Sequence, residues 1–137
     1  MKKGFGMLTA LLLGAVLIFG CARGDVKNAE RIVGDSELYS SAAIEKAMDV
    51  VIRQFEREFP GCTLLEVEYD EEVSAKHSGE WAEQYDANEA IVLLSSFRTD
   101  EKGGKGNLNP DYTYERFQWV LTRSFWGGWK IQTMGYA

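Results

Sequence analysis

The chain has 137 residues, of which 26% are charged, and a formal net charge of −6. This length suits one small domain with a core of its own. The excess of acidic side chains makes nucleic acid and anionic membrane surfaces poor partners. The two cysteines, Cys21 and Cys62, are too few for a disulfide framework or a zinc cluster. The sequence therefore predicts no metal site and no bound cofactor.

The first twenty residues have the pattern of an export signal. Two lysines near the start precede an uncharged apolar run over residues 7–20, which is shorter than the roughly 20 apolar residues of a membrane-spanning helix. Residues 18–21, IFGC, resemble a bacterial lipobox, in which the cysteine receives lipid, such as palmitate, and becomes the new N-terminus. Phe19 is bulkier than the usual small residue at its position. The alternatives are an ordinary secretory signal with an incidental cysteine and an uncleaved anchor.

This resemblance predicts a lipoprotein signal peptide at residues 1–20 and lipidation of Cys21. The protein would then be held on the extracytoplasmic face of the cell membrane. Residues 1–20 contain two basic and no acidic side chains, so the processed chain has 13 basic and 21 acidic ones, a formal charge of −8. Residues 21–39 are polar and aperiodic and predict a flexible tether. Residues 40–137 form the predicted domain.

The best marked element is a helix over residues 44–59. Its apolar side chains recur at the three-four spacing of one helical face, and Ser40 and Ser41 offer N-caps. Pro60 ends it, because the residue before a proline is pushed out of helical dihedral angles. We expect this helix to pack across the concave face of a sheet. The side chains expected at the centre of the contact are Val51, Ile52 and Phe55.

Strands follow this helix. Residues 63–70 alternate with period two, which places Leu65 and Val67 on one buried face. The polar stretch after them favours a short helix of about two turns around Trp81. Residues 90–98 begin with apolar side chains on both faces, which indicates a central strand.

Two more strands complete the predicted sheet. The glycine, asparagine and proline residues of 100–111 favour a long hairpin loop, and residues 112–125 form an aromatic-rich strand. Residues 126–128, WGG, predict a tight turn into a last strand at 129–136. The sequence thus predicts an α+β domain, in which a long N-terminal helix packs on a curved antiparallel sheet of about four strands.

Several short motifs are spread over the predicted domain. They are Phe59–Leu64, Trp81–Tyr85, Ile91–Leu93, Ser95–Phe97, Leu108–Pro110, Trp119, Gly128–Lys130 and Gly135–Tyr136. In these motifs the chain resembles an uncharacterised family of small lipoproteins from Gram-positive gut anaerobes. The element order is also similar to the nuclear-transport-factor-2-like cone and the related cystatin-like roll, in which a curved sheet packs on a long helix and can enclose a pocket. Such folds host enzymes, ligand carriers and interaction modules, so the resemblance does not determine function.

Candidates for chemistry are few. His77, the only histidine, lies in a polar stretch and is expected to be a solvated loop residue rather than a catalytic one. The acid run over residues 66–72 lacks the ligand spacing of a calcium loop and predicts a solvated strand face. The glycine-rich residues 103–107 lack P-loop spacing and predict a plain hairpin loop. Cys62 is expected to be a small buried residue rather than a reactive thiol.

The aromatic side chains are numerous for a domain of this size, and a subset of them can line a pocket. Trp81, Tyr85 and Trp119 are the candidate binding residues, with core packing as the alternative. No nucleophile, metal or cofactor motif is present. The sequence therefore predicts a membrane-tethered, non-catalytic module that binds a small ligand or a protein partner. The alternative is a small cone-fold enzyme, an isomerase or dehydratase, that uses a buried acid as its base.

The lipobox resemblance gives a direct prediction. Replacing Cys21 with Ala is expected to release the protein from the membrane or leave it unprocessed, because the acyl acceptor is lost. Detergent phase partitioning and the mass of the N-terminal peptide measure this. A Cys21→Ala protein that is cleaved at the same site and still partitions into detergent would show that the anchoring hypothesis is wrong.

Overall fold

The computed structural model describes residues 23–136 as an α+β fold with two helices on a five-stranded sheet. The predicted signal peptide and Cys21 lie outside these residues. In chain order the elements are β1 (Glu30–Ile32), α2 (Ser41–Glu58), β2 (Cys62–Tyr69), α3 (Glu71–Gln84), β3 (Glu89–Thr99), β4 (Thr113–Arg123) and β5 (Lys130–Gly135).

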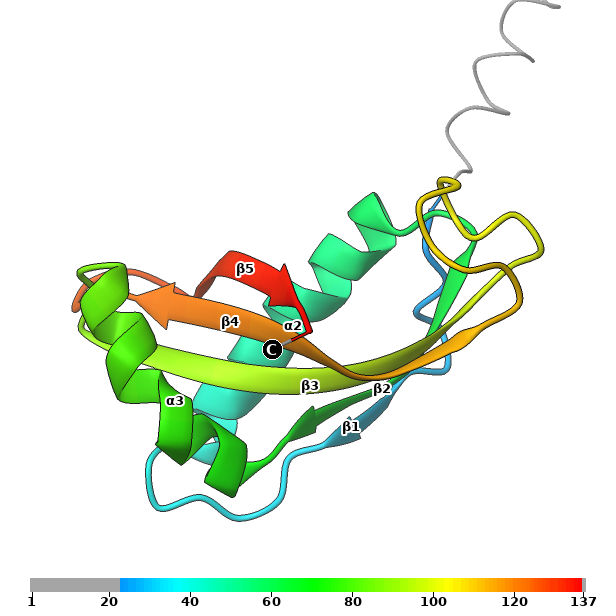
Figure 1. Ribbon diagram of the computed structural model, residues 1–137. Helices are drawn as coiled ribbons and strands as arrows, with labels where there is room; N and C mark the ends of the chain where they lie inside the picture. The colour runs from blue at the N-terminus through cyan, green and yellow to red at the C-terminus, as the bar shows by residue number, and fades with distance from the viewer. Residues whose placement is uncertain (1–22, 137) are drawn as a thin grey trace, which may run out of the picture.

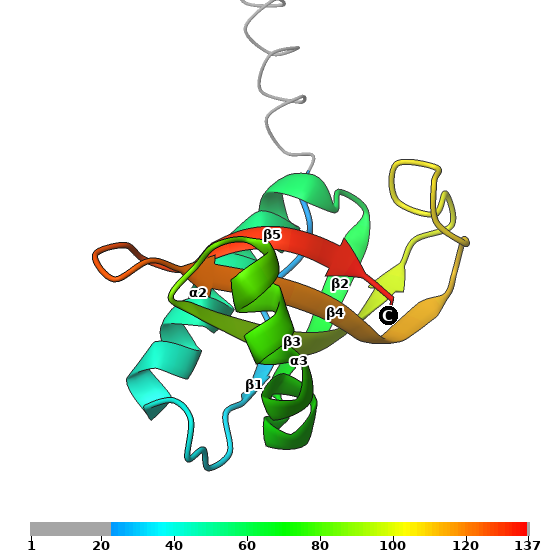
Figure 2. The same cartoon turned by 60° about the vertical axis from the view of Figure 1, so that its left-hand side comes forward.

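The sheet order is β1-β2-β3-β4-β5, with β1 parallel to β2 and the other neighbours antiparallel. The two helices lie on opposite sides of the sheet (Figures 1 and 2). The predicted α+β class is confirmed. The sheet differs from the prediction, because it is mixed and has five strands instead of about four.

The helix α2 begins and ends close to the predicted residues. The side chain of Ser40 accepts a hydrogen bond from the backbone N–H of Ala43 at 3.1 Å, which caps the first turn. The helix stops before Pro60, as expected. Val51 and Phe55 are fully buried against the sheet, whereas Ile52 is half-buried.

An aromatic layer fills the space between α2 and the sheet. Phe55 stacks on Phe59 with 4.7 Å between ring centroids, and Phe59 meets the rings of Phe97 and Trp119 at 5.3 and 5.8 Å. Burial of each such side chain contributes roughly 1.5–3 kcal/mol. Within residues 23–136, the other face of the sheet, where α3 lies against β3, carries no comparable aromatic layer.

The strand β2 differs from the simple alternation that the sequence predicts. Its pairing with β3 shifts between Leu64 and Glu66, so Leu64 and Val67 both face α2 while Leu65 is 41% exposed. A β-bulge adds one residue to a strand and reverses the alternation beyond it. The prediction that Leu65 is buried was therefore wrong.

The strand β3 is central, as its apolar faces predict, because it pairs with β2 on one edge and β4 on the other. Ile91 and Leu93 belong to the core under α2, whereas Ala90 and Val92 are buried on the α3 side. The hairpin loop between β3 and β4 is also confirmed. Asp100 orders it by accepting a hydrogen bond from the N–H of Gly104 at 2.9 Å.

The segment predicted as a flexible tether, residues 21–39, is part of the fold from residue 23 onward. The backbone N–H of Asp25 donates to the Cys62 carbonyl at 2.9 Å, and β1 pairs with β2. Arg31 forms a 2.7 Å ion pair with Asp49 of α2. These contacts join residues far apart in sequence, so the local polar pattern could not reveal them. Between residues 23 and 136, neither helix has the length and apolar content needed to cross a membrane.

Gly24 makes the closest approach of this segment to α2. Its N–H donates to the Glu56 carbonyl at 2.9 Å. A Cβ at Gly24 would lie 2.6 Å from the Phe55 carbonyl oxygen and 2.9 Å from that of Phe59. Both obstacles are backbone atoms, which cannot move without distorting the helix. Only glycine fits at this position.

Replacing Gly24 with Ala is therefore expected to destabilise the domain by about 1–3 kcal/mol, the usual cost of overpacking. Gly79→Ala is the matched control, because a Cβ at Gly79 has no atom within 4 Å and the site is exposed on α3. The control is expected to be neutral or up to about 1 kcal/mol more stable. Urea unfolding measures the free energy of unfolding of both variants. Equal stability of the two would contradict the close packing of Gly24 against α2.

Candidate binding site

The helix α3 forms one wall of a pocket on its side of the sheet. The side chain of Asp70 caps it by accepting a hydrogen bond from the N–H of Val73 at 3.2 Å. The buried Ser74 accepts another from the N–H of Val92 in β3, also at 3.2 Å. With 14 residues, α3 is longer than the two turns predicted around Trp81. Its cap and its contact with β3 stabilise a helix that has little apolar pattern of its own.

Glu71 ties the first turn of α3 to the segment before α2. Its carboxylate accepts hydrogen bonds from Ser36 Oγ and from the N–H of Glu37, both at 2.7 Å, and from the Tyr69 hydroxyl. These hydrogen bonds, the one from Tyr69 first, lower the pKa of Glu71. Burial raises the pKa of Tyr69 to about 12, so this phenol stays protonated as a donor.

A pocket of about 200 Å³ lies between α3 and the adjoining parts of β4 and β5; we name it the α3–β5 pocket. It is lined by His77, Trp81, Gln118, Val120, Thr133, Met134, Gly135 and Tyr136. The polar side-chain groups of this lining are an imidazole, an amide, an indole N–H and two hydroxyls, and among the described residues no carboxylate, Lys or Arg side chain lines it. This lining suits an uncharged ligand. His77, predicted to lie in a solvated loop, is instead a half-buried residue of α3.

The structure separates the three predicted binding residues. Trp81 lines the α3–β5 pocket, and Tyr85 stacks on it with 5.9 Å between ring centroids. Trp119 lies on the other face of the sheet, fully buried under α2, where its Nε1–H donates to Ser95 Oγ at 2.8 Å. Trp119 is therefore a core residue, and only Trp81 and Tyr85 lie together.

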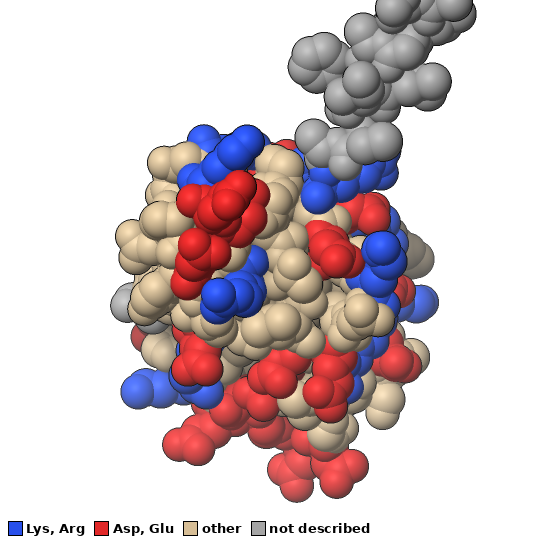
Figure 3. Space-filling model, turned by 90° about the vertical axis from the view of Figure 1, so that its right-hand side faces the viewer, with Lys and Arg blue, Asp and Glu red and all other residues tan. Residues whose placement is uncertain are grey.

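The acid run over residues 66–72 lies on a largely open surface. Glu66 and Glu68 border a shallow groove with Glu115 and Arg116. Figure 3 shows acidic side chains gathered along the lower edge of the face it presents. Among residues 23–136, no group of three or more His, Cys, Asp or Glu side chains is placed to hold a metal ion.

Cys62 is buried, in agreement with the prediction of a small buried residue. It borders a second cavity, of about 320 Å³, between the end of α2 and the β3–β4 loop. Burial, with a smaller contribution from Asp100, raises the pKa of the thiol to about 11. The thiolate that nucleophilic chemistry requires is thus scarce at neutral pH.

Phe125 and Trp126 form an exposed pair in the turn between β4 and β5, which we name the aromatic tip. Trp126 is 93% exposed and Phe125 75%, with 4.9 Å between ring centroids. The sequence predicts Phe125 at a strand end and Trp126 in a tight turn, and neither is among the predicted binding residues. The available signal was two adjacent aromatic residues next to two glycines, where no strand alternation can bury both rings.

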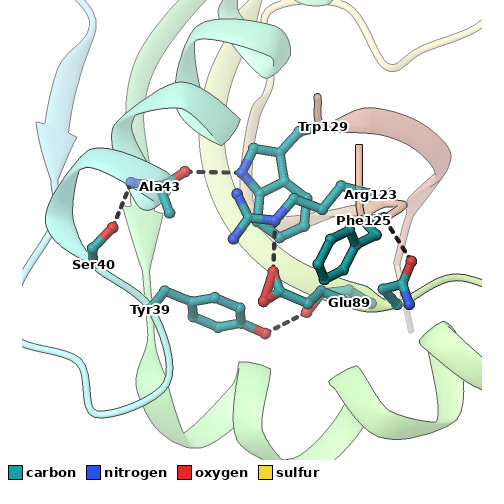
Figure 4. Close-up of polar contacts among 9 residues, drawn as sticks. Tyr39, Ser40, Ala43, Glu89, Arg123, Phe125 and Trp129 are labelled. Atoms are coloured by element: carbon teal, nitrogen blue, oxygen red, sulfur yellow. Dashed lines mark hydrogen bonds and ion pairs between the residues drawn. The ribbon is translucent and has the colours of Figure 1, made fainter. Parts of the chain in front are cut away.

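The base of the aromatic tip is firmly held (Figure 4). The N–H of Phe125 donates to Asn88 Oδ1 at 2.6 Å, and Arg123 Nε pairs with Glu89 Oε2 at 2.6 Å. The guanidinium of Arg123 also lies 4.3 Å from the centre of the Trp129 ring. Trp129 Nε1–H donates to the Ala43 carbonyl at 3.0 Å and so connects the hairpin to α2.

Comparison of the chain with protein-family models, with curated proteins and with solved structures gives no match. The resemblance to small lipoproteins and to the cone-type fold remains a prediction.

The contacts of Glu71 predict how stability depends on pH. Its pKa is lower in the folded than in the unfolded state, so the ionised carboxylate stabilises the fold above the unfolded pKa of about 4.3. This stabilisation is lost as pH falls through the folded pKa. Glu71→Gln is expected to be less stable than the parent at pH 7, and the difference should shrink below about pH 4. Urea midpoints across this range measure it.

Glu72→Gln is the matched control, because Glu72 is an exposed neighbour in the same helical turn whose side chain forms no hydrogen bond with the described residues. It is expected to follow the parent at every pH. A constant difference between the Glu71 variant and the parent down to pH 2 would contradict the assigned role of the carboxylate.

Proposed function

We propose that the chain is a non-catalytic interaction module, held on the extracytoplasmic face of the cell membrane by lipid on Cys21, and that it binds a protein partner through the aromatic tip. The observation that carries this proposal is the exposure of Trp126 and Phe125 on a hairpin whose base is fixed. Contiguous exposed apolar surface on a soluble domain usually marks a binding site.

The fixed base of the hairpin affects the affinity of the aromatic tip for a partner as well as the position of its two rings. Arg123 and Trp129 hold the ends of the two strands together, and Asn88 holds the backbone of Phe125. A side chain on a preorganised backbone loses less conformational entropy on binding, so more of the burial energy contributes to affinity. Aromatic side chains, Trp above all, dominate the binding energy of protein interfaces. The aromatic tip suits an apolar pocket on the partner.

A second candidate function is binding of a small uncharged ligand in the α3–β5 pocket. It is favoured by the aromatic side chains of Trp81 and Tyr136, which offer flat apolar surfaces beside the hydrogen-bonding groups of Gln118 and Thr133. A volume of about 200 Å³ limits such a ligand to a small molecule or one side chain of a larger one.

A catalytic role has less support. The enzyme hypothesis needs an acid in an apolar pocket, whereas the buried polar side chains of residues 23–136 are hydroxyl groups. They belong to Ser74, Ser95, Thr99 and Thr122. The side chains of α2 also fill the side of the sheet on which a cone-type fold would enclose its pocket.

Replacing both residues of the aromatic tip, Phe125→Ser with Trp126→Ser, tests the proposal. Loss of an aromatic hot spot of about 2 kcal/mol or more is expected to weaken partner binding by about 30-fold or more. The partner is first identified by crosslinking the full-length protein in the membranes of its host. Its affinity is then measured by titration with the purified, detergent-solubilised parent and variant.

Leu38→Ser is the control. Leu38 is likewise an exposed apolar residue, with 50% of its surface accessible, but it lies in the segment before α2 and not in the aromatic tip. It is expected to bind as the parent does, and thermal unfolding checks that all variants fold. A partner that binds the tip variant and the parent with equal affinity would refute the role of the aromatic tip. Loss of binding with Trp81→Ala instead would favour the α3–β5 pocket.

A further inference from the structure

The first described residues, from residue 23 onward, lie beside the C-terminal end of α2 in space. Hydrogen bonds of 2.9 Å join Gly24 to Glu56 and Asp25 to Cys62, so the backbone is fixed from Gly24 onward. Cys21 is three residues earlier in the sequence. Three residues span at most about 11 Å when fully extended. A lipid on Cys21 therefore has no long spacer between the bilayer and the folded domain.

The β3–β4 loop, residues 100–112, lies at the same end of the molecule. The start of the described chain is close to this loop and to the end of α2 at the upper right of Figure 1. A Cβ on Gly104 in the loop would lie 3.3 Å from the Pro60 carbonyl oxygen, which shows how near the loop is to the end of α2. We name this end, formed by residues 23–25, 56–62 and 100–112, the anchor end.

The anchor end carries four basic and six acidic side chains, a formal charge of −2, so its charges are partly balanced. Arg23 lies 3.8 Å from the carboxylate of Glu56, and Lys105 lies 3.7 Å from that of Glu58. Both pairs place a basic side chain beside the acids in the last turns of α2. These pairs reduce the repulsion that the acids would otherwise meet at an anionic membrane surface.

The acid run lies toward the other end of β2. The strand starts at Cys62, beside Asp25, and runs to Tyr69 over eight residues, a rise of roughly 23 Å. Electrostatic interactions are screened over about 8 Å at physiological ionic strength. With the anchor end on the membrane, the acid run is therefore kept largely beyond the range of the headgroup charges.

We infer that the anchor end rests directly against the lipid headgroups of the bilayer, and that the β4–β5 hairpin lies on the far side of the molecule, away from this contact. This inference rests on the proposed lipid on Cys21. The hairpin turns at the left of Figure 1, across the molecule from the start of the described chain. The aromatic tip thus stays free for a protein partner while the anchor end is covered.

Labelling of single introduced cysteines tests this orientation. Asn107→Cys places a thiol in the exposed β3–β4 loop, and Ser124→Cys, the matched control, places one beside the aromatic tip. The full-length acylated proteins are reconstituted in vesicles of phosphatidylethanolamine and phosphatidylglycerol, and reacted with a large polyethylene-glycol maleimide. The native thiol of Cys62 is buried, so it contributes little.

Transfer from detergent to vesicles is expected to slow labelling at residue 107 severalfold, because the bilayer excludes the large reagent, and to leave labelling at residue 124 unchanged. Inserting fifteen Gly and Ser residues between Ala22 and Arg23 is expected to restore labelling at residue 107. Equal labelling of both sites in acylated, vesicle-bound protein would overturn the orientation but leave the lipid anchor standing. A chain that carries no lipid, shown by its mass, would overturn the anchor and the orientation together.

Discussion

The packing of α2 against the sheet is the interaction on which the rest of the structure depends. Phe55 and Phe59 meet the rings of Phe97 and Trp119 closely enough to fill the space between helix and strands. The middle of a face filled in this way has no room for a ligand, since protein interiors are packed as densely as organic crystals. The cavity of about 320 Å³ that Cys62 borders lies at the end of α2, whereas the α3–β5 pocket lies on the opposite face of the sheet and the aromatic tip lies in the turn between β4 and β5.

Elements whose signals are local could be predicted from the sequence. The limits of α2 follow from Ser40 and Pro60, which act on the residues next to them. The central position of β3 follows from apolar side chains on both of its faces, because only a strand covered on both sides tolerates them. Trp81, a predicted binding residue, lines a pocket, and the sequence could not place His77 in the same lining.

Features that depend on distant contacts could not be predicted. The segment before α2 looks like a tether because its partners, Asp49 and Glu71 among them, follow it by many residues. Trp119 alternates along β4 as a strand residue should, but alternation does not say which of two covered faces is the core. The adjacent rings of Phe125 and Trp126 before two glycines indicated that one ring would be exposed, but the 93% exposure of Trp126 also depends on how far the hairpin projects from the sheet.

The helix α2 also sets the relation between the anchor end and the aromatic tip. Ala43, in its first turn, accepts the hydrogen bond from Trp129 at the base of the hairpin, whereas Glu56, near its end, accepts the one from Gly24. Thirteen residue steps separate these two positions, a rise of roughly 20 Å along a rigid element. A long flexible tether would let the tip sample a wide volume, whereas the short connection implied by the proposed lipid on Cys21 would confine it near the bilayer. Such confinement would raise the effective concentration toward a partner that is itself held at the membrane, and would give no such gain toward a freely diffusing one. The proposed anchor, together with the rigid domain, thus makes a membrane-associated protein the partner to seek for the aromatic tip.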